Sequence, residues 1–190
     1  MTEQKILRAQ SSDIRDVFKR WVTLEWAVGA RLVILEGLMG SGKSMLTKQP
    51  VTLDAQQSRS IELDKFLRAP VNHYTAYMAA MDINAATAAI QHALAMAPLV
   101  IAEGPMAWLV TSRARGEVPA ASVRRVYLKR MASRNPDEWE EFEFAKMEVK
   151  ARGEYFLSID RYHVGEQPWL LADLILERTG RDPIDTPANG

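Results

Sequence analysis

The sequence predicts an α/β fold with a mainly parallel sheet. Short apolar runs suited to buried strands recur along the chain, and stretches with helical periodicity separate them. The composition agrees with a globular protein, because 47% of the 190 residues are hydrophobic and 25% are charged. We therefore expect one domain with about five strands flanked by helices.

The first part of the chain is expected to be an N-terminal helical extension, residues 1–30. Residues 1–11 are polar and are interpreted as a loose lead-in. From Ile14 to Val22, apolar residues recur at three- and four-residue steps, which predicts a helix that ends near Gly29. This helix could pack on the sheet edge or form a homodimer contact.

The predicted strands and helices follow in alternation. Apolar runs predict strands at 31–36, 59–63, 98–102, 123–128 and 172–176. Alanine-rich residues 83–96 predict a helix. The sequence Asn135-Pro136-Asp137-Glu138 is typical of a helix start, so a further helix is expected to run to about Tyr155. Residues 181–190 are predicted to be a loose tail.

Composition and charge exclude several classes of function. The 24 basic residues balance the 24 acidic ones, so no overall positive field favours nucleic acid or an anionic membrane. The chain has no cysteine, which excludes disulfides, thiolate metal sites and a catalytic thiol. No apolar run approaches the ~20 residues of a membrane span, and the polar start does not resemble a signal peptide. A cytoplasmic location is expected.

The most specific motif is a glycine loop at residues 37–44, GLMGSGKS, which matches G-x-x-x-x-G-K-[ST] without a gap. Phosphate oxygens need several inward-pointing donors, and backbone N–H groups supply them where glycine leaves the approach open. The helix that follows the loop is expected to run from about Lys43 to Gln49 and to be ended early by Pro50, and its first N–H groups would add to the site. The predicted nucleotide-binding residues are Gly37, Leu38, Met39, Gly40, Ser41, Gly42, Lys43 and Ser44.

Acidic residues at predicted strand ends are candidates for phosphoryl transfer. Of Asp64 and Glu103, one carboxylate could accept the proton of an acceptor hydroxyl and the other could hold Mg²⁺, which the Ser44 hydroxyl of the loop would also ligate. Glu36 is a third acid nearby. Each could instead be a solvated acid at a strand end. The Asn-Lys-x-Asp string typical of GTPases is absent from the sequence.

Basic residues after the fourth strand could neutralise a transferring phosphoryl group. Arg130 and Arg134 would share a face of a helical turn. A solvated basic turn is the alternative. A second polar group, Asp160, Arg161 and His163, is interpreted as an ordinary salt-bridged turn.

On these motifs the chain resembles the uridine-kinase-like branch of the P-loop small-molecule kinases. GLMGSGKS is similar to the family's phosphate loop, IELDKF to its second-strand motif, IAEGP to its third-strand Glu-Gly and KRMASR to a lid with arginines. The resemblance implies a kinase-type P-loop NTPase domain over 31–180 with a small lid at about 130–157. It implies ATP as donor, Asp64 as base and Glu103 near the metal.

The acceptor is expected to lie under the segment after the second-strand motif. Aromatic faces together with a basic side chain suit a nucleoside, although the tyrosines could equally pack a helix onto the sheet. The candidate acceptor-binding residues are Phe66, Arg68, Tyr74 and Tyr77.

Three functions remain open from the sequence. The first is an ATP- and Mg²⁺-dependent kinase of a small hydroxylated metabolite, a nucleoside among the candidates, with Lys43, Asp64, Arg130 and Arg134 as catalytic residues. The second is a nucleotide-dependent switch with slow hydrolysis, or a toxin-like P-loop kinase with an unusual acceptor. The third is a non-catalytic nucleotide-binding module.

Overall fold

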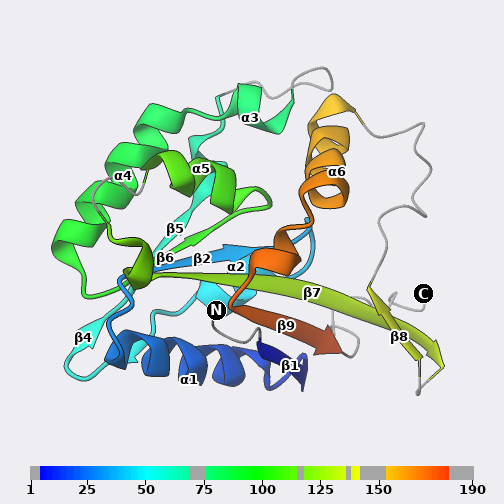
Figure 1. The fold of residues 1–190 in the computed structure, drawn as a ribbon, viewed down its shortest axis with the longest axis horizontal. Coiled ribbons are helices and arrows are strands. Elements are labelled where there is room, and N and C mark those ends of the chain that lie inside the picture. Colours follow the sequence, from blue (N-terminus) through cyan, green and yellow to red (C-terminus); the bar gives the residue numbers. More distant parts are fainter. Residues whose placement is uncertain (1–4, 69–75, 115–117, 136–137, 142–152, 180–190) are drawn as a thin grey trace, which may run out of the picture.

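The computed structural model describes residues 5–68, 76–114, 118–135, 138–141 and 153–179. These residues form a central parallel sheet with helices on both faces (Figure 1). The parallel strands are β1 (Lys5–Gln10), β2 (Leu32–Glu36), β5 (Arg59–Glu62), β6 (Val100–Glu103), β7 (Val123–Asn135) and β9 (Leu174–Thr179). The predicted α/β fold is confirmed, and the sheet has one more parallel strand than the five expected.

The strand order is β1-β9-β7-β2-β6-β5, which places β2 near the middle of the sheet. In the register of the strands, Glu36 is paired with Tyr127 of β7, and Glu103 is paired with both Leu35 of β2 and Glu62 of β5. The carboxyl ends of β2, β5 and β6 therefore meet at one edge. Ligands of open parallel sheets bind outside this edge.

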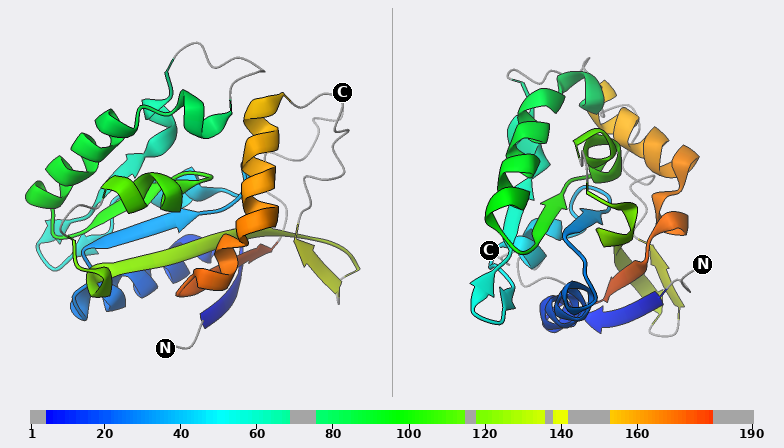
Figure 2. Two further views of the ribbon diagram at one scale, coloured as in Figure 1. Left: turned by 45° about the horizontal axis from the view of Figure 1, so that its top comes forward. Right: turned by 60° about the vertical axis from the view of Figure 1, so that its left-hand side comes forward.

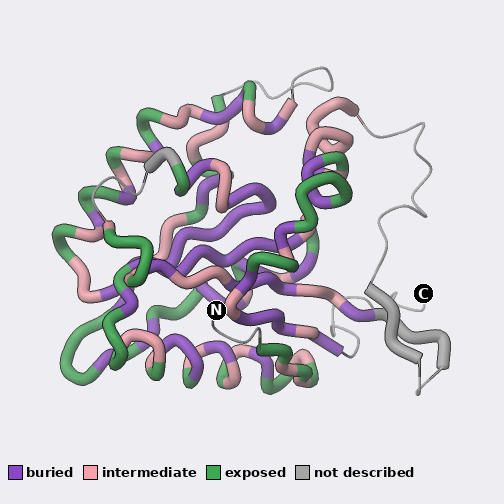
Figure 3. The backbone as a smooth tube through the Cα atoms, viewed as in Figure 1, coloured by how far each residue is buried: buried purple, intermediate pink, exposed green. Residues whose placement is uncertain are grey.

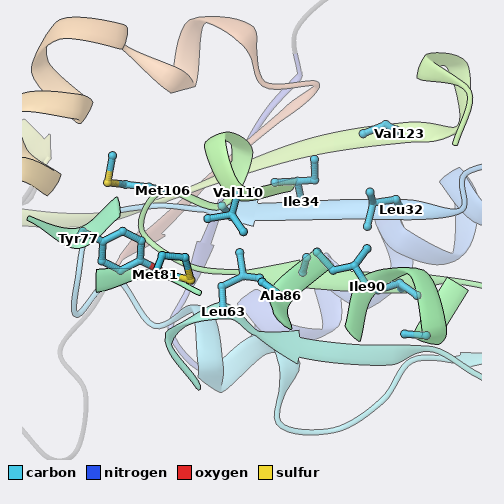
Figure 4. Packing of buried hydrophobic residues seen from close by; sticks show 14 of the residues in the cluster. Leu32, Ile34, Leu63, Tyr77, Met81, Ala86, Ile90, Met106, Val110 and Val123 are labelled. Atoms are coloured by element: carbon cyan, nitrogen blue, oxygen red, sulfur yellow. The ribbon is translucent and has the colours of Figure 1, made fainter. Parts of the chain in front are cut away.

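The residues of β2 alternate between two hydrophobic clusters, one on each face of the sheet. Leu32 and Ile34 belong to the cluster shown in Figure 4, whereas Val33 and Leu35 belong to the opposite one. Figure 3 shows that β2 and β6 are buried along their length. The first cluster includes residues of α3 (Tyr77–Ala80), α4 (Ile83–Met96), α5 (Ala107–Ala114) and α6 (Glu154–Glu166).

The second face is covered by α1 (Ile14–Ala27) and α2 (Lys43–Thr47), as the views in Figure 2 make clear for α1. Helix α2 has five residues and ends shortly before Pro50, as the sequence predicted. Buried Phe18 and Trp21 of α1 lie in the same cluster as Leu46 of α2. Arg15 of α1 also donates a hydrogen bond of 3.1 Å to the Met45 carbonyl. The N-terminal helix therefore supports the short helix after the glycine loop.

The prediction of a loose lead-in is wrong for residues 5–10, which form β1. This strand is parallel to β9, with Lys5 in register with Leu174 and Gln10 with Thr179. Backbone hydrogen bonds to an available strand edge do not require an apolar sequence, and β1 is mostly exposed. The N-terminal part of the chain therefore adds a strand to the sheet and a helix that packs on one face of the sheet.

The prediction of a helix from Asn135 towards Tyr155 is wrong for residues 138–141. Strand β7 runs on to Asn135, and β8 (Glu138–Glu141) pairs with it in antiparallel orientation. An Asn-Pro-Asp sequence suits a turn as well as a helix start, and the strand pairing decides between them. Arg130 and Arg134 therefore lie in a strand and not on a helical turn.

The remaining short elements are β3 (Thr52–Leu53), β4 (Gln56–Gln57), η1 (Leu63–Phe66), η2 (Ala120–Ser122) and η5 (Pro168–Leu171). Strands β3 and β4 form a separate antiparallel pair. Within the described part of the chain, no helix combines the length and apolar character that crossing a bilayer requires.

Candidate active site

The glycine loop connects the end of β2 to α2 and has a backbone that only glycine adopts easily. Gly42 has φ = 102°, a left-handed value that strains residues with a side chain. A β-carbon at Gly42 would also overlap Nη1 of Arg178, and one at Gly37 would overlap the Leu128 carbonyl oxygen. The glycines are therefore required by the shape of the loop and by its close neighbours.

A cavity of about 470 Å³ lies against this loop. Its walls combine loop residues, carboxylates from the ends of β5 and β6, and one arginine from β9. The lining residues are Met39, Gly40, Gly42, Lys43, Ser44, Met45, Glu62, Asp64, Glu103, Gly104 and Arg178. The structure thus brings seven predicted site residues around one space, namely Met39, Gly40, Gly42, Lys43 and Ser44 of the loop and the carboxylates Asp64 and Glu103.

Lys43 is buried and folds back onto the loop. Its Nζ donates hydrogen bonds of 2.8 Å to the Gly37 carbonyl and 2.9 Å to the Leu38 carbonyl. Burial lowers the pKa of Lys43 to about 8, while the nearby charges of Glu103 and Asp64 favour its protonated form. A bound polyphosphate would add negative charge and so raise this pKa.

Glu103 at the end of β6 is buried beside α2. Thr47 donates a hydrogen bond of 2.8 Å to its Oε1. Burial raises the pKa of Glu103, whereas hydrogen bonds from Thr47 and Ser44 oppose that rise. The Ser44 hydroxyl and the Glu103 carboxylate are therefore neighbouring oxygen ligands.

These two oxygen groups fit a hydrated Mg²⁺. Such an ion commonly takes one or two protein oxygens and completes its shell with water and phosphate. Among the described side chains, no group of three or more His, Cys, Asp or Glu residues could form an all-protein metal cage. A Mg²⁺ that arrives with a nucleotide is the kind of ion the donor set suits.

Asp64 lies in η1, immediately after β5. Its Oδ1 accepts a hydrogen bond of 2.7 Å from the hydroxyl of Tyr77, which is fully buried. Burial and the neighbouring carboxylate raise the pKa of Tyr77, so the phenol stays protonated and donates. Tyr77 also packs against Tyr155 of α6, with ring centroids 5.5 Å apart. The tyrosine fixes the orientation of the candidate base.

Of the predicted acceptor-binding residues that the structure describes, Phe66, Arg68 and Tyr77, none lines the cavity. Phe66 is partly buried and packs against the hydrophobic cluster. Arg68 is exposed, and its Nε lies 3.8 Å from Asp82 Oδ2. Tyr74 lies outside the described residues. Of the two predicted catalytic arginines, Arg130 lies in β7, and the side chain of Arg134 is outside the described part.

Glu36 immediately precedes the loop but belongs to a buried polar network. Its Oε1 accepts hydrogen bonds from the Tyr162 hydroxyl at 2.8 Å and from the Trp108 N–H at 3.2 Å. Its Oε2 lies 3.7 Å from Arg125, whose guanidinium stacks 4.1 Å above the Trp108 ring. Burial raises the pKa of Glu36, and these partners oppose the rise. The network attaches α5 and α6 to the start of the loop.

Two buried polar residues have positions that the sequence did not indicate. Arg178 is buried at the end of β9, where its Nη1 donates a hydrogen bond of 3.1 Å to the Ser41 carbonyl. Its position at the carboxyl end of a predicted strand was the signal that could have identified it. The interpretation of Asp160, Arg161 and His163 as a salt-bridged turn is wrong, because all three lie in α6 and His163 is buried.

Comparison with known proteins gives the class of fold. The solved structure of a possible uridine kinase from Bacillus stearothermophilus is similar, with a TM-score of 0.56 and 15% sequence identity. The alignment covers 87% of this chain and 98% of the other. No model of a protein family matches the chain, and no curated protein matches it.

The likeness shows that this chain shares its α/β fold with that structure, and in this chain the glycine loop lies between β2 and α2. The chain resembles the uridine-kinase-like structure in fold, as its motifs led us to expect.

Proposed function

We propose that this protein is an ATP- and Mg²⁺-dependent kinase that phosphorylates a hydroxyl group of a small metabolite. One observation supports the proposal most strongly: a single cavity is lined by Lys43 and Ser44 of the glycine loop and by two carboxylates, Asp64 and Glu103. A module that only bound a nucleotide would not need an acid that is held in place beside the end of the phosphate chain.

The proposed reaction transfers the γ-phosphoryl group in one step. The acceptor oxygen forms a bond to the γ-phosphorus while the bond to the β,γ-bridging oxygen breaks. The acceptor proton passes to the carboxylate of Asp64, and the products are ADP and a phosphate monoester. Tyr77 holds one oxygen of Asp64 at 2.7 Å, which leaves the other to face the acceptor.

As the nucleotide enters, Lys43 would give up its hydrogen bonds to the Gly37 and Leu38 carbonyls and donate to phosphate oxygens instead. Its ammonium group then neutralises charge on the β and γ phosphates, where negative charge must be stabilised during transfer. Ser44 and Glu103 would hold Mg²⁺, which supplies further positive charge to the phosphates when bound. Arg130 is proposed to add positive charge from β7.

The acceptor is proposed to enter beside Asp64, on the β5 side of the loop. A nucleoside is our first choice, supported by the resemblance of the sequence motifs and by the fold of the similar structure. Phe66, Arg68, Tyr74 and Tyr77 remain the proposed acceptor-side residues, with Tyr77 acting through its hydrogen bond to Asp64.

The test is ADP release from Mg²⁺-ATP with and without a panel of nucleosides and other small alcohols. The expected result is release that one class of acceptor stimulates, with the phosphate monoester detected by mass spectrometry. Release that no acceptor changes would favour a slow nucleotide-dependent switch. ATP that binds and is never consumed would favour a binding module.

The variant Asp64→Asn separates binding from transfer. Loss of a general base should lower turnover about 10²- to 10⁴-fold, while the affinity for ATP stays within about threefold. The matched control is Asp82→Asn, an acid at the start of α4 whose cap an asparagine can retain. Near-normal turnover of Asp64→Asn would remove Asp64 from the mechanism.

A further inference from the structure

We propose that Arg178 is a binding residue for the donor nucleotide, and that its guanidinium contacts the phosphates that remain on ADP after transfer. This inference rests on the proposed function, because it takes the ligand of the cavity to be a nucleoside triphosphate. It concerns a residue that no sequence motif indicated.

The first support is the place of Arg178 in the sheet. It lies at the end of β9, between β1 and β7, in register with Ala9 on one side and Arg130 on the other. Residues in register on neighbouring parallel strands project from the same face of a sheet. The side chain of Arg178 is 2% exposed, so a long cationic group is held inside the protein next to the loop.

The second support is its contact with the loop. Nη1 of Arg178 donates to the Ser41 carbonyl at 3.1 Å and occupies the space that a β-carbon of residue 42 would need. A guanidinium has five N–H donors in one plane, so a hydrogen bond to a carbonyl is compatible with contacts to a phosphate. The glycine at position 42 allows the charge to come this close to the backbone that surrounds the phosphates.

The third support is the direction of the cavity. Asp64 follows β5 and Glu103 ends β6, both on one side of β2, whereas Arg178 lies near the end of β9, on the other side. If the reacting γ-phosphate lies at the Asp64 end, the remainder of the nucleotide extends across the loop towards β9. Arg178 lines the cavity at that end and would meet the non-transferred phosphates.

Burial makes this contact important for affinity. The guanidinium of Arg178 is buried, so a phosphate that reaches it interacts in a medium of low dielectric constant, where the attraction between opposite charges is stronger than in water. Hydrogen bonds between a guanidinium and phosphate are charge-assisted and among the stronger ones in proteins. Removal of the charge should weaken nucleotide binding about 10- to 100-fold.

The experiment measures the dissociation constants of ATP and ADP by calorimetric titration for the wild type and for Arg178→Met. The expected result is a similar loss of about 10- to 100-fold for both nucleotides, because both have the α- and β-phosphates. The matched control is Arg161→Met, an exposed arginine of α6 that pairs with Glu154 and should leave both constants unchanged. Unchanged affinity in Arg178→Met, or a loss confined to ATP, would overturn the proposal.

A purely structural role would give a different kinetic result. If Arg178 only supported the loop, its loss would misplace Lys43, and kcat would fall at saturating ATP. We expect instead that the KM for ATP rises in proportion to the dissociation constant while kcat stays within about twofold. A fall in kcat without a rise in KM would overturn the binding role.

The proposal can also be tested without a variant, in case Arg178→Met does not fold. A crystal structure of the wild type with ADP should show a guanidinium nitrogen of Arg178 within hydrogen-bond distance of an α- or β-phosphate oxygen. Separation beyond about 4 Å from every phosphate oxygen would refute it. Failure of phosphoryl transfer is distinguishable, because nucleotide binding is measured whether or not any acceptor reacts.

Discussion

Acidification should destabilise this protein through His163, the buried histidine of α6. Nε2 lies 2.7 Å from the Pro105 carbonyl, which can only accept, so this nitrogen holds the proton. Nδ1 lies 2.9 Å from the Tyr127 hydroxyl and therefore accepts from it. The ring is neutral, and burial lowers the pKa of His163 from 6.5 to about 4, with the charge of Lys43 contributing.

The sign of the effect follows from this lowered pKa. Below pH 6.5 His163 becomes protonated in the unfolded chain, whereas in the folded protein it stays neutral until the pH falls to about 4. The contribution of the neutral His163 ring to the free energy of unfolding is therefore fully present above pH 6.5 and is lost as the pH falls towards 4. Each pKa unit corresponds to about 1.4 kcal/mol, so the whole loss is about 3 kcal/mol, of which about 2 kcal/mol is lost by pH 5.

The assay is urea unfolding at several pH values from 7.5 to 4.5, for the wild type and for His163→Gln. Glutamine can still donate to Pro105 but has no titrating ring. The variant should be less stable at pH 7.5 yet lose about 2 kcal/mol less than the wild type between pH 7.5 and pH 5. The control His92→Gln changes an exposed histidine and should follow the wild type. Parallel loss of stability in wild type and His163→Gln would refute the reasoning.

Three other predictions follow from the loop and from α1. Because the pKa of Lys43 is about 8 and bound phosphates would raise it, ATP binding at pH 8 should take up about half a proton. Titration in buffers of different ionisation enthalpy measures this uptake, which Lys43→Arg should abolish. Gly42→Ala should weaken ATP binding at least about tenfold, since it strains the loop and displaces the neighbouring guanidinium. Gly165→Ala in α6 is its control and should bind normally, because a β-carbon there meets nothing within 4 Å. Phe18→Ala should lower the unfolding free energy by about 3–5 kcal/mol in urea titrations, whereas the exposed Leu24→Ala should change it little.

The parts of the fold that the sequence predicted are those whose signal is local. The run Arg31–Glu36 is apolar at every central position, and β2 is buried on both faces as that pattern requires. The glycine loop was predictable because its residue spacing follows from the need to place backbone N–H groups around a phosphate. The short helix before Pro50 was also predicted, because proline restricts the chain by itself.

The parts that the sequence did not predict depend on distant partners. Residues 5–10 have no strand pattern, and they form a strand because β9 presents an open edge 169 residues further along the chain. The Asn135-Pro136 sequence is compatible with a helix start and with a turn, and pairing between β7 and β8 determines the outcome.

The burial of polar side chains such as Arg178 and His163 also could not be predicted from sequence patterns. Nothing in the residues around Arg178 or His163 distinguishes a buried cation or a buried neutral ring from ordinary surface residues. Arg178 becomes recognisable only when the loop lies against it, and His163 only when Pro105 and Tyr127 provide its two hydrogen bonds.

The pairing of β1 with β9 has a consequence for how this protein is made. A ribosome releases the N-terminal strand long before β9 exists, so β1 must remain unpaired until almost the whole domain has been synthesised. Contacts this far apart in sequence raise the contact order and slow folding. We expect the β9 side of the cavity to be among the last parts to assemble, and chains interrupted before β9 to lack it entirely.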